Sequence, residues 1–129
     1  MPREIFQPKG LSDPRPRYSQ LSRFGKLVYV AGQLALDANG SLVGKGDIQA
    51  QTRQVFENIQ KCLEAVGAGF DNVVKINVYL TDIRQQLGAV AKVRQEYFTS
   101  AAVPSTTVEV SRLAHPDALL EIEAIAVLD

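Results

Sequence analysis

A chain of 129 residues that is 46% hydrophobic and 22% charged has the size and composition of one globular domain, residues 1–129, and is too apolar to be disordered. Its 14 basic and 14 acidic side chains cancel to a net charge of zero, which argues against nucleic acid as a partner. No apolar run approaches the ~18 residues of a membrane span, and no apolar segment opens the chain. We therefore expect a cytoplasmic protein without a membrane partner.

The N-terminal residues 1–17 are predicted to form an irregular arm, because prolines and a glycine crowd it. The first 26 residues carry six basic and two acidic side chains, which fits either a solvated arm or an anion site near Tyr18. An extended segment follows over 18–23, and a strand over 27–36 is interrupted at Ala31-Gly32. A glycine inside a strand marks a bulge or a close approach to the backbone.

Asp47 is placed to cap a helix that runs to about Val66, and a second helical pattern covers 84–98. Three further strands are predicted: 73–81, 105–110 and 118–128. The order β-β-β-α-β-α-β-β predicts an α+β fold with a mixed sheet. The chain has one cysteine and one histidine, so we expect no disulfide, no metal site and no Ser–His–Asp triad.

Side chains alternate between the two faces of a strand, and this alternation divides the last strand. Its even positions 120–126 are apolar, whereas Glu121, Glu123, Ile125 and Val127 share the other face. The apolar set predicts two helices packed on one face of the sheet. The opposite face is too apolar for open water and too charged for a core, which predicts a contact between subunits that contains a polar pocket.

Glu121 and Glu123 lie roughly 7 Å apart on one strand face, where each can raise the pKa of the other. For Glu123 we expect a structural ion pair with a cation such as Lys75 or Arg112. For Glu121 a general acid or base is as plausible as an ion pair. If the last two strands pair antiparallel, Ser105 and Thr107 share a pocket wall with Glu121, and these groups can hold a water.

Several segments resemble the Rid family, also called the YjgF family, in the same order over nearly the whole chain. They are Tyr18-Ser19-Gln20, Val30-Ala31-Gly32-Gln33, the run 51–59, Val78-Tyr79-Leu80-Thr81-Asp82, Val108-Glu109-Val110 and Glu121-Ile122-Glu123-Ala124-Ile125-Ala126. The resemblance implies a chorismate-mutase-like fold and a homotrimer with clefts between subunits. It also implies hydrolysis of reactive enamines and imines, such as 2-aminoacrylate, without a cofactor.

The resemblance also implies roles for individual residues. Tyr18 closes the pocket, the backbone at Ala31 and Gly32 lines it, and Glu121 holds the water. Ser105 and Thr107 stand where the deaminase branch of the family has an arginine and a cysteine, the arginine being the group that binds the substrate carboxylate as a bidentate fork.

A neutral hydroxyl at position 105 provides no charge-assisted pair, and the loop 101–104 offers no replacement. Arg15 or Arg17, beside Tyr18, is an alternative source of a guanidinium. We therefore predict hydrolytic deamination of an enamine or imine other than 2-aminoacrylate. The alternative is a metabolite-binding protein that uses the same cleft without turnover. A third role, ascribed to some relatives, is RNA cleavage, and the neutral charge disfavours it.

Overall fold

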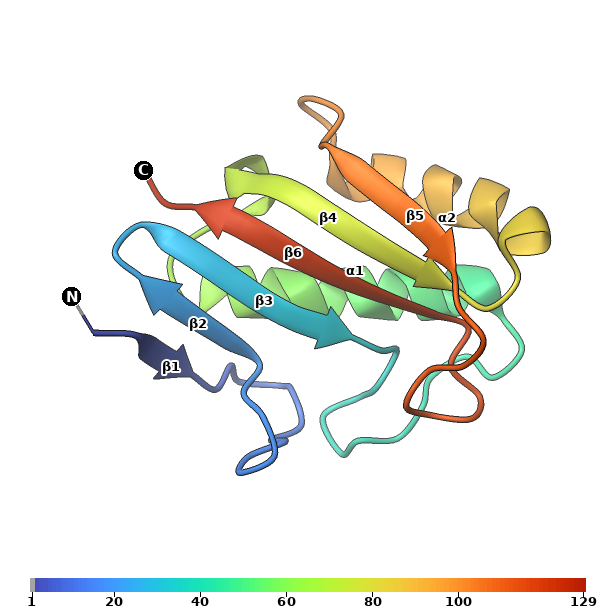
Figure 1. Ribbon diagram of the computed structural model, residues 1–129, viewed down its shortest axis with the longest axis horizontal. Helices are drawn as coiled ribbons and strands as arrows, with labels where there is room; N and C mark the ends of the chain where they lie inside the picture. The colour runs from blue at the N-terminus through green and yellow to red at the C-terminus, as the bar shows by residue number, and fades with distance from the viewer. Residues whose placement is uncertain (1) are drawn as a thin grey trace.

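Six strands form one mixed sheet in the computed structural model, which describes residues 2–129 (Figure 1). They are β1 (Glu4–Phe6), β2 (Leu21–Phe24), β3 (Leu27–Gln33), β4 (Val73–Leu80), β5 (Ser105–Glu109) and β6 (Leu120–Val127). The order across the sheet is β1-β2-β3-β6-β4-β5. Only β4 and β5 pair in parallel, and the remaining neighbours are antiparallel. The predicted element order and the mixed sheet are confirmed.

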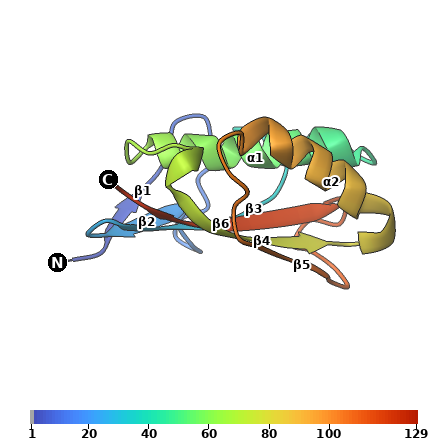
Figure 2. The same cartoon turned by 90° about the horizontal axis from the view of Figure 1, so that it is seen from above.

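Both helices begin at an aspartate that accepts a hydrogen bond from a backbone N–H of the first turn. Asp47 caps α1 (Ile48–Glu64) and Asp82 caps α2 (Ile83–Tyr97). Figure 2 shows both helices on the same face of the sheet, as predicted. Neither is long and apolar enough to cross a membrane, a statement that covers residues 2–129.

The core lies between these helices and the sheet. From β6 it takes the four predicted apolar residues, which are at most 2% exposed: Leu120, Ile122, Ala124 and Ala126. Cys62 of α1 is fully buried there. Burial raises the pKa of its thiol to about 12, so this cysteine is packing and not a nucleophile.

Two local predictions are wrong. Residues 1–17 are not irregular throughout, because Glu4–Phe6 pairs antiparallel with β2 and is held there by an ion pair between Glu4 and Arg23. The predicted strand over 27–36 ends at Gln33. Within it, the register with β6 shifts between Val30 and Gln33. The shift is a bulge at Ala31-Gly32, one of the two features that a glycine inside a strand predicts.

Candidate functional site

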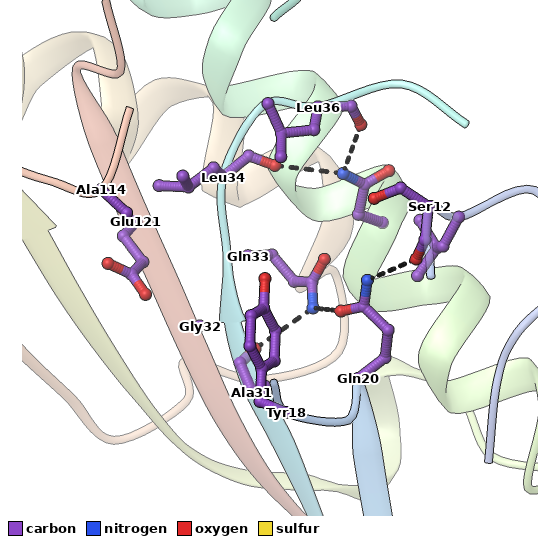
Figure 3. A pocket seen from close by; sticks show the side chains of 12 residues that line it. Ser12, Tyr18, Gln20, Ala31, Gly32, Gln33, Leu34, Leu36, Ala114 and Glu121 are labelled. Carbon is purple, nitrogen blue, oxygen red and sulfur yellow. Dashed lines mark hydrogen bonds between the residues drawn. The ribbon is translucent and has the colours of Figure 1, made fainter. Parts of the chain in front are cut away.

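A cavity of about 370 Å³ opens beside the bulge of β3 and the first residues of β6. Its walls come from the arm before β2, from the bulge and the loop that follows it, from Asn58 of α1, and from β6 with the loop before it (Figure 3). The polar and backbone groups used below belong to six lining residues: Tyr18, Gln20, Ala31, Gly32, Gln33 and Glu121. Tyr18 is 51% exposed and lies at the rim of this cavity.

Glu121 contacts the backbone of the bulge directly. A Cβ atom at Gly32 would overlap Oε1 of Glu121 and lie only 2.7 Å from its Cδ. Gly32 does not have a positive φ, so glycine is needed here for space and not for backbone conformation. The close approach that the sequence suggested at this glycine is confirmed, and the approaching group is the proposed catalytic carboxylate.

The carboxylate of Glu121 is half-buried, and no hydrogen bond from another of residues 2–129 reaches it. Burial raises its pKa, and the negative charge of Glu123 raises it further. A raised pKa favours the protonated carboxyl group, which can donate a proton and, as the carboxylate, accept one. The geometry therefore provides a proton-transfer group that is free to hold a water or a ligand.

Glu123 has a different environment on the same strand face. Its Oε1 accepts a hydrogen bond of 2.5 Å from the hydroxyl of Tyr79 and one of 3.2 Å from Nδ2 of Asn77. The hydrogen bond to Glu123 raises the pKa of Tyr79, so the phenol stays protonated and donates. Glu123 is thus a structural group, as predicted, but neutral donors satisfy it and not the expected cation.

Two buried glutamines connect the bulge to the N-terminal arm. Nε2 of Gln33 donates to Oε1 of Gln20 at 2.7 Å and to the carbonyl of Ala31 at 3.3 Å. Nε2 of Gln20 in turn donates to the carbonyl of Ser12 at 2.9 Å. The sequence interpretation missed this pair, although each amide lies within two residues of a predicted cavity residue. The pair fixes the wall opposite Glu121.

Ser105 and Thr107 do not lie beside Glu121 in the same chain. The condition for a shared pocket wall, an antiparallel pair of β5 and β6, is not met, because α2 carries the chain across to the far edge of β4, and β4 separates the two strands. Ser105 pairs with Ile76 and Thr107 with Val78, whose side chains lie under the helices. A role of these hydroxyls in ligand binding stays a prediction.

One of the two proposed sources of a guanidinium, Arg15, already has an ion-pair partner. Arg15 forms a bidentate pair with Asp13 at 2.8 and 2.6 Å, and this pair lowers the pKa of Asp13 to about 2. Its charge is therefore already used. The loop 101–104 carries no cationic side chain, but Nη1 of Arg94 in α2 donates to Oγ of Ser105 at 3.2 Å.

Metal ligands do not gather in this structure. Over residues 2–129 no group of three His, Cys, Asp or Glu side chains is placed to hold a metal ion. The polar groups that line the Glu121 cavity include a carboxylate, amides, a phenol and backbone groups.

A sheet covered by two helices on one face, with a carboxylate cavity at a strand bulge, defines a small α+β domain of the chorismate-mutase-like class. The chain belongs to the Rid family: the family model described as Endoribonuclease L-PSP matches residues 11–128.

A RutC family protein of Pyrococcus horikoshii is 40% identical over 96% of this chain and 97% of its own. The 3-aminoacrylate deaminase RutC of Acinetobacter baylyi is 36% identical over 98% of both chains. The crystal structure of a Rid family protein from Yersinia pestis superposes with a TM-score of 0.91 at 34% identity, over 98% of this chain and 100% of that one.

Proposed function

We propose that this protein is a hydrolytic deaminase of a small enamine or imine other than 2-aminoacrylate, with Glu121 as its acid–base group. The observation that carries the proposal is the half-buried carboxylate of Glu121, which lies against Gly32 with a raised pKa and no hydrogen-bond donor among residues 2–129. The 36% identity to a protein named 3-aminoacrylate deaminase supports it and makes 3-aminoacrylate the first substrate to test.

The reaction needs one proton donor and one water. Protonation of the enamine carbon by the Glu121 carboxylic acid converts C=C–NH₂ to an iminium ion, HC–C=NH₂⁺, and leaves a carboxylate. That carboxylate takes a proton from water as the water oxygen bonds to the C=N carbon. The resulting carbinolamine expels ammonia and becomes a carbonyl compound. The backbone at Ala31 and Gly32 lines the reacting group, and Tyr18 at the rim limits its access to bulk water.

The open face of the sheet supports a contact between subunits, and we propose that it forms the homotrimer that the family resemblance implies. Two cross-strand pairs make this face apolar: Leu27 with Val127, and Tyr29 with Ile125. Tyr29 is 52% exposed and Val127 is 40% exposed. A contiguous exposed apolar surface of this kind is typical of a subunit contact. Glu121 lies on the same face, so the proposed trimer places its cavity at a cleft between subunits.

The experiment is ammonia release from freshly generated 3-aminoacrylate and from a panel of imines. Glu121→Gln removes the titrating group with little change in shape, and we expect a loss of about 100-fold or more. Glu64→Gln, an exposed position at the end of α1, is the matched control and keeps the native rate. Equal rates for the native protein and Glu121→Gln on every substrate would rule out the proposed mechanism.

A second candidate is a metabolite-binding protein without turnover, which Ser105 favours because it is not the charged group of the deaminase branch. It predicts that keto acids raise the thermal unfolding temperature, that Glu121→Ala abolishes this shift, and that no substrate of the panel releases ammonia. RNA cleavage has less support, since no cationic side chain lines the Glu121 cavity within residues 2–129.

A further inference from the structure

The cavity beside Glu121 has more room than the reacting group needs. Its volume is about 370 Å³. Liquid water takes ~30 Å³ per molecule, so the cavity has room for roughly a dozen groups of that size. A three-carbon enamine such as 3-aminoacrylate fills about half of that space. Gln33 lies on the wall opposite Glu121 (Figure 3), where the rest of a longer substrate would reach it.

The side chain of Gln33 offers this space a hydrogen-bond acceptor. The residue is 3% exposed, so its polar atoms need partners within the protein or in a ligand. Its Nε2 donates to Gln20 and to Ala31, whereas no donor among residues 2–129 reaches its Oε1 (Figure 3). In these residues the only fully enclosed side-chain N or O atom without a partner is Oε1 of Gln7. Oε1 of Gln33 is therefore accessible from the cavity that this residue lines.

The orientation of the Gln33 amide is fixed by its neighbours. Nε2 donates at 3.3 Å to the backbone carbonyl of Ala31, which can only accept. It also donates at 2.7 Å to Oε1 of Gln20, whose own Nε2 donates to the carbonyl of Ser12 at 2.9 Å. Exchanging the oxygen and nitrogen of Gln33 would lose both of its hydrogen bonds and bring oxygens together. The oxygen of Gln33 therefore stays on the side away from Gln20.

The neighbouring amide on the cavity wall has no donor left for this oxygen. Asn58 of α1 uses its N–H groups on the carbonyls of Leu34 and Leu36, at 3.1 and 2.9 Å. Leu11, Leu34 and Leu36 line the same cavity and make its surface largely apolar. In apolar surroundings an unpaired acceptor is costly, and an acceptor that finds a donor forms a stronger hydrogen bond than in water.

We propose that Gln33 determines specificity, and that the preferred substrate is an enamine or imine whose side chain ends in a hydroxyl or amide N–H that donates to Oε1 of Gln33. The proposal rests on the deaminase function for the reacting end of the substrate. A neutral donor fits better than an ammonium, because Glu121 is the only carboxylate that lines the cavity within residues 2–129. An apolar end of the same size leaves the acceptor unpaired, so the cavity discriminates against it.

Two series of 2-oxo acids, the carbonyl products of the corresponding imines, test this preference on the full-length protein. In the first series the chain ends in a hydroxyl, as in 4-hydroxy-2-oxobutanoate. In the second a methyl group replaces the hydroxyl, as in 2-oxopentanoate. Calorimetric titration should give a Kd lower by about tenfold or more for the hydroxyl acid at the chain length that reaches Gln33. The NMR signals of the Gln33 side-chain NH₂ should shift more with the hydroxyl acid than with the methyl acid.

Gln33→Met removes the acceptor at a similar side-chain length, so the two acids of each pair should then bind within about twofold of each other. Gln85→Met is the matched control, because it replaces an exposed amide of α2 outside the cavity, and it should keep the native preference. If Gln33→Met does not fold, the native affinities and the Gln33 NMR shift decide. The proposal is overturned if the native protein binds both acids of every pair equally or binds neither, or if Gln33→Met keeps the preference.

Glu121→Gln distinguishes this proposal from the deaminase function, because binding of the 2-oxo acids requires no turnover. It is expected to keep the preference for the hydroxyl acid whether or not it loses turnover. A native rate in Glu121→Gln with the preference intact contradicts only the deaminase mechanism. Loss of that rate, with no preference in the native protein, contradicts only the role of Gln33.

Discussion

The carboxylate of Glu121 occupies the space that a side chain at position 32 would need, so Gly32 and Glu121 are sterically coupled across β3 and β6. The bulge turns the backbone of β3 toward Glu121, and the missing Cβ lets the carboxylate lie against it. The position of the proposed catalytic group is therefore set by a residue that has no side chain.

Gly32→Ala tests this coupling. The added Cβ meets the flexible end of Glu121, which can swing away, so we expect the free energy of unfolding to change by less than about 1 kcal/mol. The displaced carboxylate should lower deaminase activity by about tenfold or more, because misplacement near 1 Å is costly for catalysis. Steady-state kinetics and urea unfolding of the same samples measure both effects.

The control for this variant is Gly88→Ala. A Cβ at Gly88, within α2, meets nothing within 4 Å, so alanine should stabilise the protein by roughly 0.5–1 kcal/mol and leave activity unchanged. In a Glu121→Ala background Gly32→Ala should have no further effect. A loss of activity at Gly32 that persists in that background would show that the coupling runs through another group.

Glu121→Gln should stabilise the protein in a pH-dependent manner. Burial raises the pKa of Glu121 in the folded state above its ordinary value of 4.5, so ionisation of this group disfavours folding. Below pH 4.5 both proteins carry an uncharged side chain, and their stabilities should be similar. As pH rises through the folded-state pKa the native protein loses stability that the variant keeps, so the difference grows to a plateau.

Thermal unfolding of both proteins from pH 4 to pH 8 measures this difference. A stability difference that is constant over the whole range would show that Glu121 has the same pKa in the folded and unfolded states.

Tyr79→Phe removes the 2.5 Å hydrogen bond to Glu123. The acceptor is a carboxylate that is partly exposed. We therefore expect the free energy of unfolding to fall by about 1 kcal/mol, at the low end for hydrogen bonds to charged groups. Urea unfolding measures it. In a Glu123→Gln background the same substitution should lower the free energy of unfolding by less. An equal decrease in the two backgrounds would mean that the hydrogen bond does not contribute to stability.

Gln33→Met removes the amide that donates to Gln20, leaving the buried Oε1 of Gln20 without its donor. An unsatisfied buried acceptor costs about 1–3 kcal/mol. Gln85→Met, at an exposed position of α2, is the control and should change stability by less than about 0.5 kcal/mol. Equal stability of the two variants in urea would show that water replaces the lost donor.

Tyr29→Lys tests the proposed trimer. Tyr29 is exposed opposite Ile125 on the open face of the sheet, and a lysine ammonium buried there without a partner should dissociate the subunits. Light scattering should show three chains for the native protein and one for the variant. Leu87→Lys is the control, because it replaces an apolar residue that is 43% exposed on α2 by the same charged residue. It should leave the molecular mass of the assembly unchanged.

Local signals in the sequence were sufficient to predict both helices, every strand except β1, and the Glu121 side of the cavity. Aspartate caps and apolar spacing predicted both helices, and the alternation in β6 separated the core residues from Glu121 and Glu123, because these patterns depend only on neighbours along the chain. Gly32 within a strand predicted the bulge. The similarity of Tyr18 and the Glu121 segment to one family pointed to the same cavity.

Which strands lie side by side was decided only by the tertiary structure. The pairing of β5 with β4 follows from the path of α2, and it moved Ser105 and Thr107 to the face opposite Glu121. The same path brought Arg94 to Ser105, eleven positions along the chain. Contacts of this kind depend on how helices and strands pack in three dimensions and not on local periodicity. The sequence pattern alone therefore did not reveal that the guanidinium of Arg94 lies next to Ser105.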